Sequence, residues 1–314
     1  MAVTMNDVVC IGLMAADIVA RRVSGFHFDK DSEEVESISL TNGGDAFNTA
    51  VNLVTLGVGT TLIGKVGDDA LGRFLLARAD MAGVNTDAIS VDPMEPTCTS
   101  IAIIDGSGER RFIHSTGANR SLCPEDIDSS MFTNYRVVHL GGACALPLLD
   151  GVGLAYVARE ARRAGCITTM DVTWDKDGAW LEKIEAALPH LDYFLPSVNE
   201  LKLIAGTEDP ERAATHMLSL GVSHTIVKLG ASGCLVATKT TTEYVAGYRV
   251  ECVADTTGAG DAFVAGFISG LCRDWPLIQC ARFANAVGSC AVRAVGATEG
   301  VTGIESALAL IESE

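Results

Sequence analysis

Short aliphatic runs alternate with amphipathic stretches along most of the chain. The runs are rich in β-branched residues, as buried strands are, and the stretches between them show the apolar spacing of helices. This alternation predicts an α/β fold with a mostly parallel, doubly wound sheet and helices on both faces. The predicted strands are 8–14, 60–65, 137–141, 167–172, 193–195, 225–228 and 234–237, and the predicted helices are 47–56, 70–81, 151–164, 200–205, 211–220, 261–272, 276–294 and 303–312.

Two segments interrupt this alternation. Segment 18–40 is charged and has no helical pattern, and segment 98–115 contains two strand-like runs that flank Asp105-Gly106-Ser107-Gly108, which is typical of a hairpin. We expect the two segments to form a small inserted β lid. The predicted domains are a main α/β domain, 1–16, 43–95 and 117–314, and a lid, 17–42 and 96–116.

The most specific motif is Asp255-Thr256-Thr257-Gly258-Ala259-Gly260-Asp261, which precedes an aliphatic helix. Its glycines let several N–H groups converge on one anion at the positive end of that helix, so a phosphate group fits there. Asp261 is then a candidate acceptor for the proton of an approaching hydroxyl. The alternative is an ordinary helix start preceded by a glycine turn.

A second glycine cluster, Gly43-Gly44-Asp45-Ala46-Phe47-Asn48, also opens a helix. With both motifs in place, the chain resembles the ribokinase, or PfkB, family of carbohydrate kinases from Asp17 to about Gly300. The resemblance implies a ribokinase-like fold and ATP-dependent phosphorylation of a sugar hydroxyl, with Mg²⁺ as a cofactor.

Composition and charge narrow the function classes. The 314 residues are 48% hydrophobic and only 6% aromatic, which suits one large aliphatic core. The formal charge of -17 argues against a nucleic-acid partner or an anionic membrane surface. Because no apolar run is long enough to span a bilayer and the N-terminus lacks the order of a signal peptide, we expect a cytoplasmic protein.

Several other patterns exclude alternative sites. The ten cysteines are scattered without a C-x-x-C pair, so we expect reduced thiols rather than disulfides or a metal site. His139 lies in an apolar run and is expected in the core. Segment 59–66 matches a P-loop except at Val66, which has no hydroxyl for Mg²⁺, and the order of elements there is wrong. No G-x-G-x-x-G follows the first strand, so dinucleotide binding lacks its main support.

Polar residues near the strand ends predict a sugar site. Asp17 follows the first strand, where a carboxylate can accept hydrogen bonds from two hydroxyls, and Asn48 offers both a donor and an acceptor. Otherwise Asp17 is a turn residue and Asn48 a helix-start contact. The resemblance implies that Asp17, Gly43, Gly44, Asn48 and Asp261 hold the sugar, that Asp261 is the base, and that Gly258, Ala259 and Gly260 form an anion hole. We expect Asp17 and Asp261 to face one pocket.

The nucleotide side is predicted around Lys228, which ends a strand before a glycine turn, and Asn285, within a long helix. Taken alone, Lys228 is also compatible with a solvated strand end, and Asn285 with a polar contact of its helix. The resemblance implies that Asn199, Lys228, Gly230, Gly233, Gly260 and Asn285 surround ATP, and that Asp255, Thr257, Ala291, Ala294 and Gly296 hold a monovalent cation such as K⁺.

One departure from the family concerns its N-x-x-E motif, which organises Mg²⁺. The chain reads Asn199-Glu200-Leu201-Lys202, so a lysine replaces the expected glutamate. Glu200 is the candidate substitute, unless phosphates and water hold the metal. Lys202 could instead contact phosphate.

Alternatives of other classes stay open. A basic cluster in the predicted hairpin, Arg110, Arg111 and His114, is compatible with a phosphosugar acceptor or with a solvated face. The acceptor could also be a nucleoside. A further alternative is a sugar- or nucleotide-binding module without catalysis. The expected partners are a small-molecule sugar and ATP, with a homodimer through the lid as an additional possibility.

Overall fold

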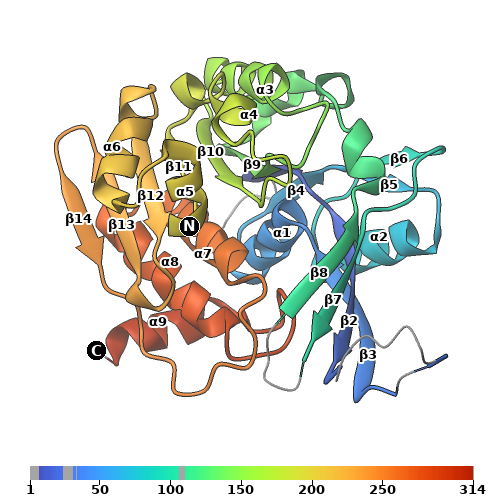
Figure 1. Ribbon diagram of the computed structural model, residues 1–314. Coiled ribbons are helices and arrows are strands. Elements are labelled where there is room, and N and C mark those ends of the chain that lie inside the picture. The colour runs from blue at the N-terminus through green and yellow to red at the C-terminus, as the bar shows by residue number, and fades with distance from the viewer. Residues whose placement is uncertain (1–6, 24–30, 33, 106–109, 314) are drawn as a thin grey trace.

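The computed structural model describes residues 7–23, 31–32, 34–105 and 110–313. Its centre is an eight-stranded sheet in which β1, β4, β9, β10, β11 and β12 run parallel and β13 and β14 are antiparallel (Figure 1). The strand order is β14 (Thr242–Val245), β13 (Cys234–Thr238), β12 (His224–Lys228), β11 (Tyr193–Phe194), β10 (Ile167–Val172), β9 (Val137–Ala143), β1 (Val8–Gly12) and β4 (Thr60–Ile63). The predicted α/β fold with a mostly parallel sheet is confirmed.

Helices cover both faces of this sheet, and the central strands are buried on both sides. In β1, Val8 and Cys10 pack into one apolar cluster, whereas Val9 and Ile11 pack into the other. A strand buried in this way needs apolar residues at every position, which explains its continuous aliphatic run. The first cluster contains α1 (Asp45–Thr55), α2 (Ala70–Ala82), α7 (Ala259–Cys272), α8 (Leu277–Ala291) and α9 (Ile304–Glu312), and the second contains α3 (Val152–Arg163), α4 (Leu181–Ile184), α5 (Val198–Ala205) and α6 (Pro210–Ser219).

A separate four-stranded sheet projects from the main body at the lower right of Figure 1. Its order is β3 (Ser37–Gly43), β2 (Ala15–Arg21), β7 (Thr99–Ile104) and β8 (Arg110–Ser115), and a third sheet pairs β5 (Lys65–Gly67) with β6 (Ser90–Asp92). The four-stranded sheet confirms the predicted β lid. Asp17 lies within β2, opposite Thr41 and Ser100, rather than in a turn after β1. The predicted hairpin turn falls mostly on residues 106–109, which lie outside the described residues, as do residues 24–30 of the first lid segment.

Several elements differ from the sequence prediction, among them α4, β6, the end of α8 and β14. The helix expected over 276–294 ends at Ala291, because the carbonyl of Val292 accepts hydrogen bonds from the N–H groups of Ala254 and Asp255. Strand β14 was not predicted, since its exposed threonine and glutamate residues carry little apolar signal. Among the described residues, no helix combines the length and the apolar character needed to cross a membrane.

Candidate active site

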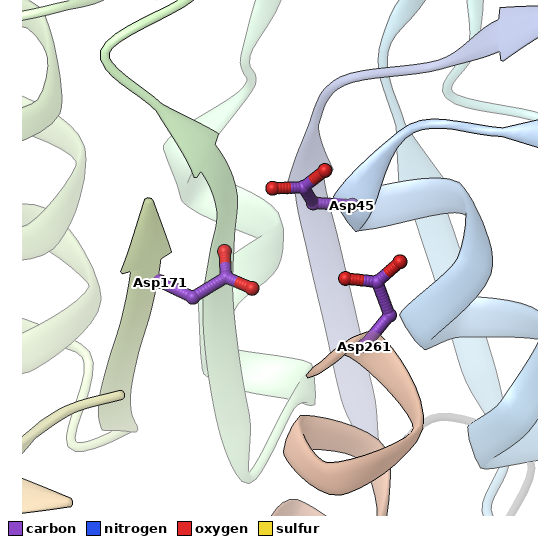
Figure 2. A group of neighbouring side chains, drawn as sticks. All are labelled: Asp45, Asp171 and Asp261. Atoms are coloured by element: carbon purple, nitrogen blue, oxygen red, sulfur yellow. The ribbon is translucent and has the colours of Figure 1, made fainter. Parts of the chain in front are cut away.

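Three carboxylates converge beyond the carboxyl end of the central sheet. One oxygen from each of Asp45, Asp171 and Asp261 lies within 4.8 Å of the other two (Figure 2). Asp45 is in the first turn of α1, Asp171 is near the end of β10, and Asp261 is in the first turn of α7. Glycine turns precede both helices, so the two motifs found in the sequence meet in space.

Burial raises the pKa of all three carboxyl groups. The first cause of the shift is burial in each case, and for Asp261 the neighbouring Asp171 adds to it and brings the pKa to about 7. Asp171 is 1% exposed and accepts a hydrogen bond from the N–H of Gly142 at 3.0 Å. A carboxyl group with a pKa near neutral can exchange a proton at physiological pH.

Lys228 supplies the opposing charge. Burial alone would lower its pKa, but Asp171, Glu200, Asp261 and Asp45 together raise it above the usual value. A Cβ added at Gly260 would lie 3.5 Å from Nζ of Lys228, so the ammonium group lies beside the start of α7. The lysine and the positive end of the helix therefore act on the same small volume, which favours an anion there.

The turn before α7 requires glycine at Gly258. Its φ of 72° is left-handed, and a Cβ at this position would lie 2.2 Å from the carbonyl oxygen of Ala297. No other residue fits such a position without moving the backbone. The next two residues, Ala259 and Gly260, line a cavity of about 940 Å³ together with Asp261.

This large cavity gathers the residues predicted for the nucleotide. All six of them line it, namely Asn199, Lys228, Gly230, Gly233, Gly260 and Asn285, and so do the Mg²⁺ candidate Glu200 and the acids Asp45, Asp171 and Asp261. Asn285 donates from Nδ2 to the carbonyl oxygens of Val245 and Ala246 at 3.1 and 3.0 Å, so its amide anchors the end of β14.

The helix after β11 explains the roles of Glu200 and Lys202. Glu200 accepts a hydrogen bond from the N–H of Ser197 at 2.7 Å and completes a capping box, while it also lines the cavity. Lys202 pairs with Glu208 at 2.8 Å and is not among the described residues that line the cavity. The side chain of Lys202 is therefore directed away from the cavity, which argues against the alternative that it contacts phosphate.

Asp17 and Asp261 line two cavities whose walls share the segment 255–257, and a single pocket for both acids stays a prediction. Asp17 lines a cavity of about 290 Å³ between the small sheet and the segments around Asp255 and Glu299. Its carboxylate packs against Gly43, where an added Cβ would lie 2.2 Å from Oδ2. Burial raises the pKa of Asp17 to about 6, although a hydrogen bond with the Ser100 side chain acts to lower it.

Residues 42–48 connect the two acids. Gly43 touches the carboxylate of Asp17, and Asn48 donates from Nδ2 to Oδ2 of Asp261 at 2.8 Å. Gly44 has a φ of 92°, and a Cβ there would lie 2.6 Å from the carbonyl oxygen of Leu13, so this turn also requires glycine. Segment 42–48 therefore contacts both candidate sugar-binding acids, Asp17 and Asp261.

The residues predicted for a monovalent cation lie around Asp255. Its carboxylate accepts hydrogen bonds from the N–H and hydroxyl of Thr257 at 2.9 and 2.8 Å, and from the N–H of Gly296 at 3.2 Å. Ala291 ends α8, and its carbonyl oxygen accepts from the N–H of Ala294 at 3.5 Å. These hydrogen bonds connect Asp255, Thr257 and Gly296, whereas Ala291 and Ala294 form a turn at the end of α8.

Two members of the carboxylate group, Asp45 and Asp171, have no role among the sequence predictions. Asp171 is an acid inside an otherwise aliphatic strand, and that unusual placement was an available signal. Asp45 belongs to the glycine cluster before α1, and its signal is an acid directly after two glycines at a helix start. His139 is fully buried, as predicted, and burial lowers its pKa to about 3, so it is neutral although Nε2 lies 3.9 Å from Oδ1 of Asp171.

Comparison with known proteins finds sugar kinases among similar sequences and similar structures. A probable chloroplastic fructokinase-6 of Arabidopsis thaliana is 29% identical over 306 residues, which cover 92% of this chain and 78% of the relative. The structure of Arabidopsis thaliana ribokinase complexed with ribose and ATP matches 98% of this chain and 99% of its own, with 26% identity and a TM-score of 0.86. An Escherichia coli protein described as a ribokinase II, in complex with ATP and Mg²⁺, matches 98% of this chain and 100% of its own, with 25% identity and a TM-score of 0.85.

The match to a family model extends over almost the whole chain. The model of the pfkB family carbohydrate kinases covers residues 5–302, which include the carboxylate group, both glycine turns and the small sheet. The fold, the site and this match lead to the same conclusion: the chain belongs to the PfkB family of carbohydrate kinases.

Proposed function

We propose that this protein transfers the γ-phosphoryl group of ATP to a primary hydroxyl group of a sugar, with Asp261 as the base. The observation that carries the proposal is the position of Asp261, which lines the large cavity in the first turn of α7, beside Lys228 and with a pKa of about 7. The ribokinase complexed with ribose and ATP supports the substrate classes.

In the proposed step, Asp261 accepts the proton of the sugar hydroxyl as that oxygen attacks the γ-phosphorus. The bond from the γ-phosphorus to the bridging oxygen breaks, and the electron pair leaves with ADP. The N–H groups of Gly258, Ala259 and Gly260 stabilise the negative charge of the transferred group, and the nearby ammonium of Lys228 adds to this effect. Catalysis then depends mainly on positioning and electrostatics.

The large cavity suits a nucleotide. Gly230 has a φ of 61° and open space where a Cβ would lie, so its backbone can be approached closely. We assign ATP contacts to Asn199, Lys228, Gly230, Gly233 and Gly260, which all line this cavity. Asn285 contributes to the same wall by holding the backbone of Val245 and Ala246 in place.

The donor set also suits Mg²⁺, which prefers carboxylate oxygens and water. Asp45 and Asp171 lie close enough to Asp261 to share one ion, and Glu200 lines the same cavity. We propose that Asp45 and Asp171 would hold Mg²⁺, with Glu200 as a further carboxylate on the same cavity wall. When bound, Mg²⁺ neutralises charge on the phosphate oxygens.

We assign the sugar to Asp17, Gly43, Gly44 and Asn48, next to Asp261. Support comes from segment 42–48, which contacts the carboxylates of both Asp17 and Asp261. The small sheet, as a lid over this position, would exclude water, which competes with the sugar as the phosphoryl acceptor. The division of the chain into a main domain and a lid follows from that role.

Two further proposals concern a cation and a partner. We propose a K⁺ site at Asp255, Thr257, Ala291, Ala294 and Gly296, supported by the hydrogen bonds that hold Asp255, Thr257 and Gly296 together. We also propose a homodimer through the lid, because one face of the small sheet carries exposed apolar side chains. These are Ile38, Leu40, Ile101 and Ile113, with exposed fractions of 69%, 42%, 38% and 60%.

The test is an ADP-release assay over a panel of pentoses, hexoses, phosphosugars and nucleosides, with Mg²⁺ present. We expect acceptor-dependent ADP release with unphosphorylated sugars. Activity only with phosphosugars or nucleosides would replace the assigned acceptor class. Binding of ATP and sugar in a thermal-shift experiment, without ADP release for any acceptor, would contradict the kinase assignment.

A further inference from the structure

One face of the small sheet begins with a polar row. Residues directly opposite each other on neighbouring strands place their side chains on the same face. The register sets Thr41 of β3 opposite Asp17 of β2, and Asp17 opposite Ser100 of β7. Asp17 and Thr41 both line the cavity of about 290 Å³, so this face of the sheet is directed into the cavity.

The next row on the same face is mainly apolar. Two residues after Asp17, Val19 lies opposite Ala102, and Ala102 lies opposite Phe112. Because side chains alternate between the two faces of a sheet, this row is directed into the same cavity, and all three residues line it. Ser39, opposite Val19, is its polar member. Phe112 is 52% exposed, so an aromatic ring is left partly uncovered on the cavity side.

Helix α2 supplies a further apolar wall. Phe74 lines the cavity and is half-buried against the first apolar cluster. Arg78 lines it too, but its Nη2 donates to Oδ1 of Asn42 and to Oε1 of Glu299, at 3.0 Å each. Because the guanidinium group is already paired with a carboxylate, the cavity favours an uncharged ligand.

Thr41 carries a buried hydroxyl group that lacks a partner. Oγ1 of Thr41 makes no hydrogen bond with the residues that the structure describes, although it is shielded from solvent. Buried polar groups are nearly always paired, so an orphan on a cavity wall indicates a partner that arrives with a ligand. A sugar hydroxyl between Asp17 and Thr41 suits this position, because the carboxylate only accepts whereas the threonine hydroxyl both donates and accepts.

The order of the two rows gives the acceptor a direction. The polar row is next to Gly43, which touches Asp17, and the same segment reaches Asp261 through Asn48. The apolar row lies further from Gly43 along β2. An acceptor with its reacting hydroxyl at Asp261 and its ring hydroxyls at the polar row therefore has its far end against the apolar row. In a furanose, the anomeric carbon lies across the ring oxygen from the carbon that carries the primary hydroxymethyl group.

We infer that the acceptor is an uncharged sugar with a small apolar group on its anomeric carbon, that Phe112 contacts this group and that Thr41 binds a ring hydroxyl. Phe112 and Thr41 are then specificity-determining residues. The inference rests on the proposed function and narrows its acceptor class, since a free sugar has a hydroxyl group at that carbon. An apolar wall distinguishes ligands that differ by one methylene group by a factor of about 10–200.

The test uses matched pairs of acceptors, namely D-ribose with methyl β-D-ribofuranoside and D-fructose with methyl β-D-fructofuranoside. Phe112→Ala removes the exposed ring, and it is preferred to a change at Phe74, which packs against the core. Thr41→Val removes the hydroxyl group and keeps the shape, and Thr41→Ser keeps the hydroxyl group. The matched control is Val91→Ala on β6, because Val91 is 51% exposed and is not among the described residues that line the cavity.

The main readout is the ratio of kcat/KM for the glycoside to kcat/KM for the free sugar, measured by ADP release. We expect the wild type to prefer the glycoside in at least one pair, and Phe112→Ala to lower that ratio about tenfold or more. The KM for ATP should stay within about twofold. Val91→Ala should keep the wild-type ratio. Because every variant meets the same mixture of ring forms of the free sugar, a changed ratio reports on the protein. A wild type without this preference, or an equal ratio in Phe112→Ala, would overturn the inference.

Thr41 is tested by binding and stability together. Thr41→Val should raise the KM for the glycoside about tenfold, and Thr41→Ser should restore it. The ligand-free Thr41→Val protein should unfold at the same temperature as the wild type or higher, because its hydroxyl group has no partner there. A hydroxyl with a merely structural role would give a lower unfolding temperature and an unchanged KM, and an unchanged KM overturns the assignment of Thr41.

Calorimetry with the same pairs separates this inference from the proposed function. In a protein that releases no ADP, tighter binding of a methyl glycoside than of its free sugar, lost in Phe112→Ala, would support the inference and refute the kinase role. ADP release with free sugars alone would support the kinase role and overturn the inference.

Discussion

Asn48 and Asp261 are hydrogen-bonded at 2.8 Å although they are 213 residues apart in the sequence. The bond joins the first turns of α1 and α7, each of which begins after a glycine turn. A donor on one helix start and an acceptor on the other thus meet where the positive ends of both helices lie. This pairing is the structural centre of the proposed phosphoryl-transfer site.

Replacement of Asp261 by Asn should remove the proposed base while keeping the size of the side chain. General-base catalysis typically contributes a factor of about 10²–10⁴, so we expect kcat to fall by that amount. Binding of ATP, measured by calorimetry, should change little. The control is Asp80→Asn, at an exposed position on α2. A variant with wild-type kcat would show that another group accepts the proton.

Asp17→Asn should weaken sugar binding and stabilise the ligand-free protein. We expect the KM for the sugar to rise at least about tenfold, and the KM for ATP to stay within about twofold, because the lost hydrogen bonds to hydroxyl groups belong to the sugar alone. Steady-state kinetics with each substrate varied in turn measures both values. An equal rise in the two KM values would argue against a sugar contact.

The stability effect of Asp17→Asn has a definite pH dependence. The pKa of Asp17 is about 6 in the folded protein against 3.8 for the free group, so the folded state binds more protons between these values. Wild-type stability therefore falls as pH rises from about 4 to about 6. The variant lacks this loss. Its free energy of unfolding at pH 7, measured by urea unfolding, should therefore exceed that of the wild type by up to about 3 kcal/mol. A gain that is the same at pH 4 and pH 7 would contradict this explanation.

Lys228→Met should leave the carboxylate group without its compensating charge. We expect the free energy of unfolding to fall, and to fall more at pH 8 than at pH 5, because protonation of the carboxyl groups relieves their repulsion at low pH. Thermal unfolding across this pH range measures the effect, with exposed Lys239→Met as the control. A pH-independent loss would show that Lys228 acts by packing alone.

The lid-mediated dimer predicts a specific change of mass. The wild type should have twice the chain mass of 32.9 kDa in light scattering coupled to size-exclusion chromatography. Ile113→Asp, which places a charge on the apolar face of the small sheet, should give a monomer. Val152→Asp, at an exposed position on α3, should remain a dimer. A monomeric wild type would refute the dimer.

The main sheet was predictable from the sequence because its signal is local. Strands such as β1, β9 and β10 are buried on both faces, so their aliphatic runs stand out from the amphipathic helices between them. The turn at Gly258 was also predictable from a local signal, because a left-handed backbone position before a helix selects glycine. Strand β14 has mostly exposed residues and gave no comparable signal.

The polar contacts of the site depend on the tertiary structure and could not be read locally. Arg78 meets Asn42 only because α2 packs beside the small sheet, and Asp171 meets Asp45 only because β10 lies two strands from β1. The direction of Lys202 depends on Glu208, in the loop after α5. Sequence spacing does not determine any of these contacts, and each changes the interpretation of the site.

The most direct test of the central claim is product analysis with the wild type and Asp261→Asn side by side. Each enzyme is incubated with ATP, Mg²⁺ and the best sugar of the panel, and phosphorus NMR follows the new phosphate ester. We predict that the wild type forms a phosphomonoester on a primary carbon in equal amount to ADP, and that Asp261→Asn forms almost none while still binding ATP. ADP release without a sugar phosphate, or equal ester formation by both enzymes, would contradict the account.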